Sequence, residues 1–123
     1  MFIRFVAGDD INDTFWATGV ITIAKDLIAA HLLEDWAVER IEDIFSELNL
    51  RLPVPPFSKS NWPPEAVSWF KDSAKETIAL VREIEKLLKH HDIPTRTILT
   101  DNPGKILYED DYQIIAEIKN WVK

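Results

Sequence analysis

The sequence predicts an α+β domain in which three helices pack against a mainly antiparallel sheet. Three observations lead to this fold class: a short β-rich segment near the start, three stretches with helical periodicity, and three β-rich segments joined by turns near the end. A chain of 123 residues, 46% of them hydrophobic, is ordinary for one soluble domain with its own core. We therefore expect residues 1–123 to form a single domain, whose N-terminal strand joins a C-terminal three-stranded meander.

The first strand and the first helix are predicted from residue type and spacing. Residues 2–6 are aromatic or β-branched and precede Gly8-Asp9-Asp10, which is typical of a strand that ends in a turn. Asp13 or Thr14 is then expected to cap a helix. The apolar residues of this helix follow the i, i+3, i+4 spacing of one buried face: Trp16, Val20, Ile23, Leu27 and Ile28.

Two longer helices lie on either side of a proline-rich connection. We expect the second helix over residues 35–50, and the third from a cap at Asp72 or Ser73 to about His91, with Ser73 and Glu76 at the spacing of a capping box. Five of the seven prolines lie within residues 53–64, which excludes a regular helix or a central strand there.

The remaining segments are predicted to be strands. Residues 66–70 are compatible with a helical turn or a short strand, and we favour the strand. Residues 95–100, 105–109 and 112–118 read as the three strands of the meander. Asn102-Pro103-Gly104 suits the first turn between them, and Asp110-Asp111 is expected to form a two-residue hairpin turn.

Three motifs in the second half of the chain carry a resemblance to a known family. They are Trp69-Phe70-Lys71, Asn102-Pro103-Gly104-Lys105 and Tyr108-Glu109-Asp110-Asp111-Tyr112-Gln113. With these motifs the chain resembles a family of small bacterial cytoplasmic proteins of no established activity, over a little under half of its length. The resemblance implies a bacterial cytoplasmic domain and assigns no catalytic residue.

Composition and charge exclude several classes of protein. No apolar run is long enough to span a bilayer, and the absence of cysteine excludes disulfides, thiol catalysis and cysteine-ligated metals. The absence of cysteine also fits a reducing cytoplasm. The net charge of −7 argues against nucleic acid or an anionic membrane as the partner. All of the excess negative charge lies in residues 1–50, which hold three basic and ten acidic residues.

The second helix carries the most distinctive charge pattern, which we call the acidic stripe: Asp35, Glu39, Asp43 and Glu47. These residues step by four along the helix and therefore share one side, with Glu42 beside them. The common interpretation of such a charge run is a solvent-exposed helix face without a binding role, with lysines from the second half of the chain nearby. Its functional interpretations are a docking surface for a basic protein partner or a weak divalent-cation site.

No other group predicts a definite site. Asp9, Asp10, Asn12 and Asp13 lack the ligand spacing and central glycine of an EF-hand loop. His31 lies three residues before Glu34 and four before Asp35, a spacing that would bring imidazole and carboxylate together on an unbroken helix. His90 and His91 are expected at the C-terminus of the third helix, where their polarity or positive charge interacts favourably with the helix dipole. We expect no metal, no cofactor and no catalytic residue, because no nucleophile motif stands out.

The last hairpin predicts self-association. With a two-residue turn, Ile106, Tyr108 and Ile115 would share one face, and Leu107 and Ile114 the other, so both faces would be partly apolar. A second subunit is one way to cover the second face, and we expect a homodimer; the third helix or the proline-rich connection are the alternatives. The five tryptophans favour the same interpretation.

These observations favour a non-catalytic, self-associating interaction domain that presents the acidic stripe to a partner. The alternative is a small carboxylate-based enzyme or a divalent-cation or ligand-binding domain. Its site would lie in a cleft between the first loop and the second helix.

Overall fold

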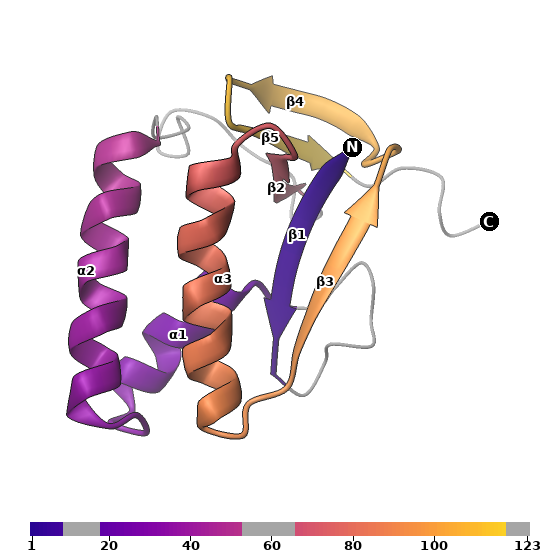
Figure 1. Cartoon of the computed structure of the whole chain (residues 1–123). Helices are drawn as coiled ribbons and strands as arrows, with labels where there is room; N and C mark the ends of the chain where they lie inside the picture. The colour runs from indigo at the N-terminus through magenta and orange to yellow at the C-terminus, as the bar shows by residue number, and fades with distance from the viewer. Residues whose placement is uncertain (9–17, 53–65, 118–123) are drawn as a thin grey trace.

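The described residues of the chain form a five-stranded sheet with three helices on one side (Figure 1). The computed structural model describes residues 1–8, 18–52 and 66–117. The helices are α1 (Val20–Ala29), α2 (Asp35–Arg51) and α3 (Lys75–His90). The strands are β1 (Phe2–Ala7), β2 (Ala66–Lys71), β3 (Thr95–Thr100), β4 (Lys105–Glu109) and β5 (Gln113–Glu117). The predicted α+β class is confirmed, and residues 66–70 belong to a strand.

The strand order is β3-β1-β2-β5-β4, and every neighbouring pair is antiparallel. The predicted three-stranded meander is therefore wrong in one respect: β4 and β5 form a hairpin, but β3 lies at the opposite edge and pairs with β1. β3 forms six register pairs with β1, from Phe2–Thr100 to Ala7–Thr95, although β3 is much closer in sequence to β4. Adjacency in the chain was a poor guide to pairing here.

The sheet is strongly curled, as the connection between its two edge strands shows. Only residues 101–104 join β3 to β4. Five strands in a flat sheet would place the edges about 19 Å apart. A fully extended connection of this kind spans roughly 17 Å between the last Cα atom of β3 and the first Cα atom of β4. The edges must therefore bend toward each other, and Figure 1 shows β4 and β5 lying across the top of the view, steeply inclined to β1 and β3.

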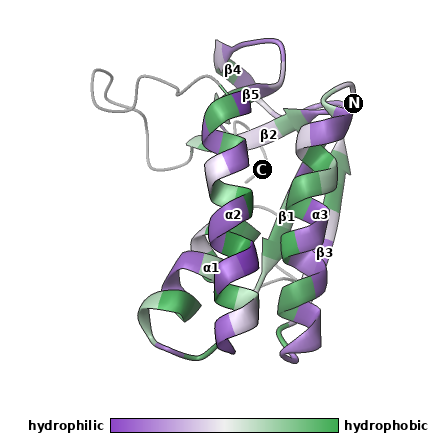
Figure 2. Cartoon of the chain, turned by 60° about the vertical axis from the view of Figure 1, so that its left-hand side comes forward, coloured by the Kyte–Doolittle hydropathy of each residue, from purple (hydrophilic) through white to green (hydrophobic). Residues whose placement is uncertain are grey.

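The main core lies between the helices and one face of the sheet. Ile3, Phe5 and Ala7 alternate along β1 and belong to one core cluster with buried residues of all three helices. Figure 2 shows hydrophobic and hydrophilic residues recurring in bands along α2 and α3, as expected of helices with one buried side. The buried side of α3 consists of Ile78, Val81, Ile84 and Leu88, and Leu87 packs against the core beside them.

The second face of the sheet has its own apolar cluster. Its buried members are Val6, Trp69, Ile98, Ile114 and Ala116. In the part of the chain that the structure describes, no helix contributes to this cluster. The four strands that supply its members curl around it, so the curvature of the sheet itself helps to bury this face. The indole Nε1 of Trp69 is buried there and has no hydrogen-bond partner among the described residues.

Two predicted helix starts are wrong. Gly19 is the N-cap of α1, since its backbone is extended and it forms an isolated bridge with Val6, so Asp13 and Thr14 cannot cap this helix. In α3 the N-cap is Ala74, with no side-chain cap hydrogen bond, and the Ser73–Glu76 capping box is not formed. None of the three helices described is long and apolar enough to cross a bilayer.

Candidate functional site

The acidic stripe lies on α2, on the side turned away from the core. Ala37, Ile41, Ile44 and Leu48 form the buried side of the helix. The stripe residues Asp35, Glu39, Asp43 and Glu47 are all exposed, and so is Glu42 beside them. The i, i+4 spacing thus brings the carboxylates together as predicted, and it leaves them in contact with water.

The two arginines of α2 are occupied by carboxylates of α3. Arg40 forms a two-nitrogen ion pair with Glu83, and Arg51 pairs with Glu76. The hydrogen bond to Glu83, with its charge, raises the pKa of Arg40, and the bond from Arg40 lowers the pKa of Glu83. The cations of α2 therefore face its neighbour α3.

Glu47 differs from the other three stripe residues. Its carboxylate accepts a hydrogen bond from Nε of Arg51 at 3.2 Å, one helical turn away. Hydrogen bonds to Glu47 and Glu76 raise the pKa of Arg51. Asp35, Glu39 and Asp43 form no ion pair with any residue of the described ranges 1–8, 18–52 and 66–117. The part of the stripe without an ion pair is therefore its first three members, of which Asp43 lies close enough to Arg40 to help raise the pKa of that arginine.

Exposed apolar side chains lie at the two ends of the stripe. Trp36 is 49% exposed and Leu50 is 85% exposed. They are fourteen positions apart with Asp43 midway, and a spacing of seven keeps all three on nearly the same side of a helix. The outer side of α2 thus combines an aromatic residue, a row of carboxylates and a leucine.

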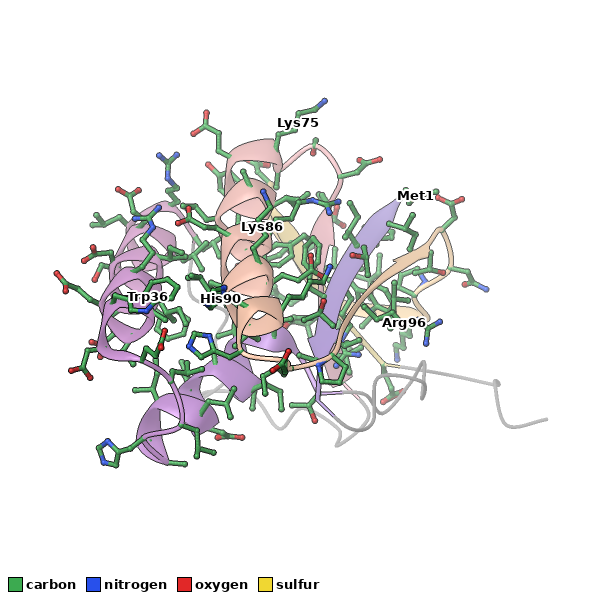
Figure 3. All side chains as sticks on the ribbon, turned by 60° about the horizontal axis from the view of Figure 1, so that its bottom comes forward. Met1, Trp36, Lys75, Lys86, His90 and Arg96 are labelled. Atoms are coloured by element: carbon green, nitrogen blue, oxygen red, sulfur yellow. The ribbon has the colours of Figure 1, made fainter. Side chains whose placement is uncertain are left out.

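Trp36 is held in place by the end of α3. Its indole N–H donates a hydrogen bond to the carboxylate of Glu34, and its ring meets that of His90 edge-on at 5.3 Å between centroids. Figure 3 shows Trp36 on α2 and His90 on α3 side by side, with Lys75 at the far end of α3. This contact fixes the start of the acidic stripe relative to α3.

The three histidines lie at the C-terminal ends of α1 and α3. His31 lies in the turn after α1 with a φ of 58°, so no continuous helix carries it to Glu34 or Asp35. Nδ1 of His91 donates to the carbonyl of Leu87 at 2.8 Å, and its Nε2 lies 3.4 Å from the backbone N–H of Glu34. Among residues 1–8, 18–52 and 66–117, no three His, Asp or Glu side chains form a group that could hold a metal ion.

The predicted first acidic loop is not part of the described structure. Asp9, Asp10, Asn12 and Asp13 lie outside the described residues. The alternative of a cation or catalytic site between this loop and the second helix depends on them, so it stays a prediction.

The last hairpin differs from its predicted register. A β-bulge between Ile106 and Tyr108 pairs Ile106 with Ala116 and Tyr108 with Ile115. Paired residues share a face, so Ile106 and Tyr108 lie on opposite faces, and the predicted common face of Ile106, Tyr108 and Ile115 is wrong. Ile106 is 43% exposed and Tyr108 is half-buried, whereas Ile115 is only 1% exposed and offers no surface to a partner.

The predicted two-residue turn is also wrong. Three residues, Asp110, Asp111 and Tyr112, separate β4 from β5. The Asp110 carboxylate organises this loop by accepting four hydrogen bonds: from the N–H groups of Tyr112 and Gln113, the hydroxyl of Tyr108 and the side-chain amide of Gln113.

Sequence patterns did not indicate the cavity beside β1. Its volume is about 470 Å³, and residues of β1, β2, β5, α1, α3 and Leu52 line it. None of these residues forms a local motif, because the cavity exists only where the strands separate. A pocket of this size lies within the usual range for small-molecule sites.

Comparisons with protein-family models, with curated proteins and with solved structures found no match to this chain.

Proposed function

We propose that this protein is a non-catalytic interaction domain that binds a basic protein partner through the outer side of α2. The observation that carries the proposal is the exposure of Asp35, Glu39 and Asp43 on a helix whose own arginines pair with α3. Like charges four residues apart destabilise a helix by about 0.2–0.5 kcal/mol per pair. A partner that supplies cations removes this repulsion.

The apolar ends of the stripe support a partner with a particular pattern. Trp36 and Leu50 are separated by roughly 21 Å along α2. Partly exposed tryptophans often anchor protein interfaces, with charged residues around them. An amphipathic segment with basic residues between two apolar ones matches this surface in both charge and length.

The proposal includes self-association and a cytoplasmic location. Two copies of the acidic stripe repel each other, so a homodimer would use a different surface, and the exposed Ile106 at the hairpin is our candidate. The cytoplasmic location agrees with the absence of cysteine from the composition. The net charge of −7 disfavours nucleic acid as the partner.

A defined peptide tests the proposed surface. The probe is a synthetic amphipathic helix with lysines between two leucines, titrated into isotopically labelled protein at two salt concentrations. We expect the indole signal of Trp36 and the amide signals of α2 to shift, and the binding to weaken at the higher salt because exposed charges are screened.

A charge-matched pair of variants gives the control. Glu39→Lys with Asp43→Lys reverses the stripe, whereas Asp26→Lys with Asp111→Lys changes the net charge equally at exposed sites elsewhere. We expect the first variant to bind the peptide at least tenfold more weakly than the second. Equal binding by the two variants would show that only net charge matters and would contradict the proposed surface.

A further inference from the structure

The cavity beside β1 arises because β1 and β2 separate soon after they meet. Their register contains only two pairs, Phe2–Lys71 and Ile3–Phe70, although each strand has six residues. Farther along, β1 pairs instead with the chain before α1: Val6 bridges to Gly19, and the N–H of Ala7 donates to the carbonyl of Thr18 at 2.9 Å. The gap between the diverging strands forms the cavity.

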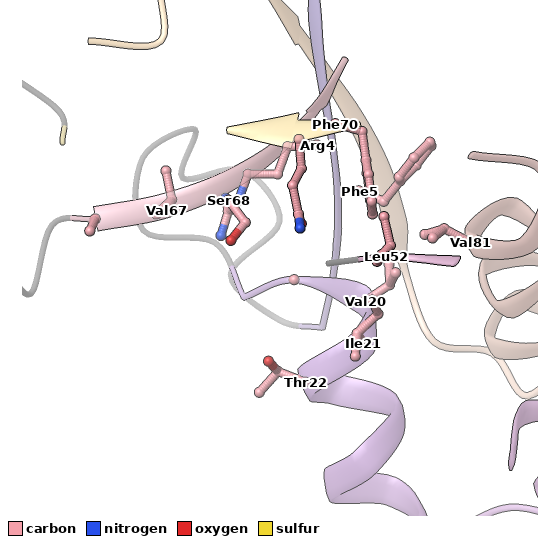
Figure 4. A pocket seen from close by; sticks show the side chains of 13 residues that line it. Arg4, Phe5, Val20, Ile21, Thr22, Leu52, Val67, Ser68, Phe70 and Val81 are labelled. Atoms are coloured by element: carbon pink, nitrogen blue, oxygen red, sulfur yellow. The ribbon is translucent and has the colours of Figure 1, made fainter. Parts of the chain in front are cut away.

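The cavity has an apolar side and a polar side. Figure 4 shows the side chains of Phe5, Val20, Leu52, Phe70 and Val81 gathered on one side, while Arg4 and Ser68 lie together on the other. Phe5, Val20 and Val81 are fully buried members of the main core, so the apolar wall is preformed. Ligand sites commonly have this composition, with apolar walls and a few polar groups that orient the ligand.

The charge of the cavity is opposite to that of the protein. Among residues 1–8, 18–52 and 66–117, those that line it include one cation, Arg4, and no aspartate or glutamate, whereas the whole chain carries a net charge of −7. Gly19, Val20, Ile21 and Thr22 also line it. They form the start of α1, which has no side-chain cap and no acidic residue in its first turn. The positive end of the helix dipole therefore adds to the charge of Arg4.

We propose that this cavity binds a small carboxylate with an apolar body. The carboxylate would lie beside the guanidinium of Arg4 and the hydroxyl of Ser68, and the apolar body would contact Phe5 and Phe70. Arg4 and Gln113 each have an interaction within the protein, so the ligand's carboxylate would add to the contacts that Arg4 already makes. Hydrogen bonds between ionised partners are about twice as strong as neutral ones, which makes the guanidinium the main source of selectivity.

Three eight-carbon probes that differ only in the head group test the proposal on the unmodified protein: octanoate, octanol and octylamine. We expect octanoate to shift the amide signals of Phe5, Val20, Ser68 and Phe70 in NMR spectra. Octanol should bind about tenfold more weakly or worse, since it lacks the charge-assisted hydrogen bond. Equal affinities of octanoate and octanol would overturn the carboxylate selectivity, and no shift at these residues with any probe at millimolar concentration would overturn the site.

Variants test whether Arg4 supplies the positive charge that favours octanoate over octanol. Arg4→Gln should weaken octanoate binding about tenfold and leave octanol binding unchanged, whereas Lys86→Gln, which removes one positive charge from an exposed position on α3, should change neither. Ser68→Phe adds apolar volume within the cavity and should abolish binding of both probes. Retained octanoate affinity in a folded Arg4→Gln protein would refute the role of Arg4. The comparison of the three probes does not depend on the folding of any variant.

Discussion

Asp110 illustrates how one side chain sets a local structure. Partial burial raises the pKa of its carboxyl, but the hydrogen bonds from Tyr112, Tyr108 and Gln113 outweigh this effect and hold the pKa below its ordinary value. The contact with Tyr108 also raises the pKa of Tyr108, because the Tyr108 hydroxyl donates a hydrogen bond to the Asp110 carboxylate. The charged carboxylate therefore stabilises the hairpin loop.

Replacement of Asp110 tests this coupling. We expect Asp110→Asn to lower the pKa of Tyr108 toward its ordinary value and to reduce the free energy of unfolding by about 1 kcal/mol at neutral pH. Asp111→Asn, at the next and exposed position, is the control and should leave both quantities nearly unchanged. NMR titration of the Tyr108 ring and denaturant unfolding measure the two effects.

The sign of the pH dependence follows from the lowered pKa of Asp110. The unfolded chain binds the proton more readily, so the contribution of Asp110 to stability is present above the ordinary aspartate pKa, near 3.9. It is lost as the pH falls from there through the lower folded-state pKa. The difference in stability between the wild type and Asp110→Asn should shrink over that interval, and a constant difference down to pH 2 would contradict this account.

At the scale of single elements, α2 is stabilised by its buried side. Ile41 is fully buried in the main core, whereas Leu50 is almost fully exposed on the opposite side. We expect Ile41→Ala to lower the free energy of unfolding by about 2–5 kcal/mol and Leu50→Ala to change it by less than about 0.5 kcal/mol. Denaturant unfolding of both variants gives the comparison. A similar loss for both would mean that the outer side of α2 is also packed.

The sequence predicted which helices and strands form, but it did not predict where α1 starts or how β4 pairs with β5. Hydrophobic periodicity identified α2 and α3, because their buried sides repeat over four turns or more. The start of α1 was missed because Gly19 is positioned by its bridge to Val6, a contact between distant segments that no local pattern records. The β-bulge in the hairpin was missed for a related reason, since it depends on how β4 fits against β5.

At the scale of the whole molecule, the surfaces of α2 and of the hairpin have separate roles in our proposals. We expect a homodimer that persists in high salt, because an interface around Ile106 would be apolar, while two acidic stripes repel each other. Sedimentation at two salt concentrations measures the state, and Ile106→Glu should yield a monomer. A monomeric wild type at both salt concentrations would refute self-association.

The two candidate sites differ in how far the sequence could reveal them. The acidic stripe was predictable because four residues at a spacing of four share one side of any helix. The cavity was not, because Arg4, Ser68 and Val81 belong to three elements that come together only in the folded chain. Recognising it required knowing that β1 and β2 diverge after two pairs.

The position of β1 in the sheet has a consequence for folding kinetics. β1 ends at Ala7, and its two neighbouring strands begin at Ala66 and Thr95. Apart from the local contacts of Val6 and Ala7 with Gly19 and Thr18, the edges of this apolar strand cannot be paired until long loops have closed. The β4–β5 hairpin and the helices need only local contacts. During synthesis β1 leaves the ribosome before β2 and β3 and would wait for both, and we expect its unpaired edges to be the segment most exposed to aggregation on the way to the native state.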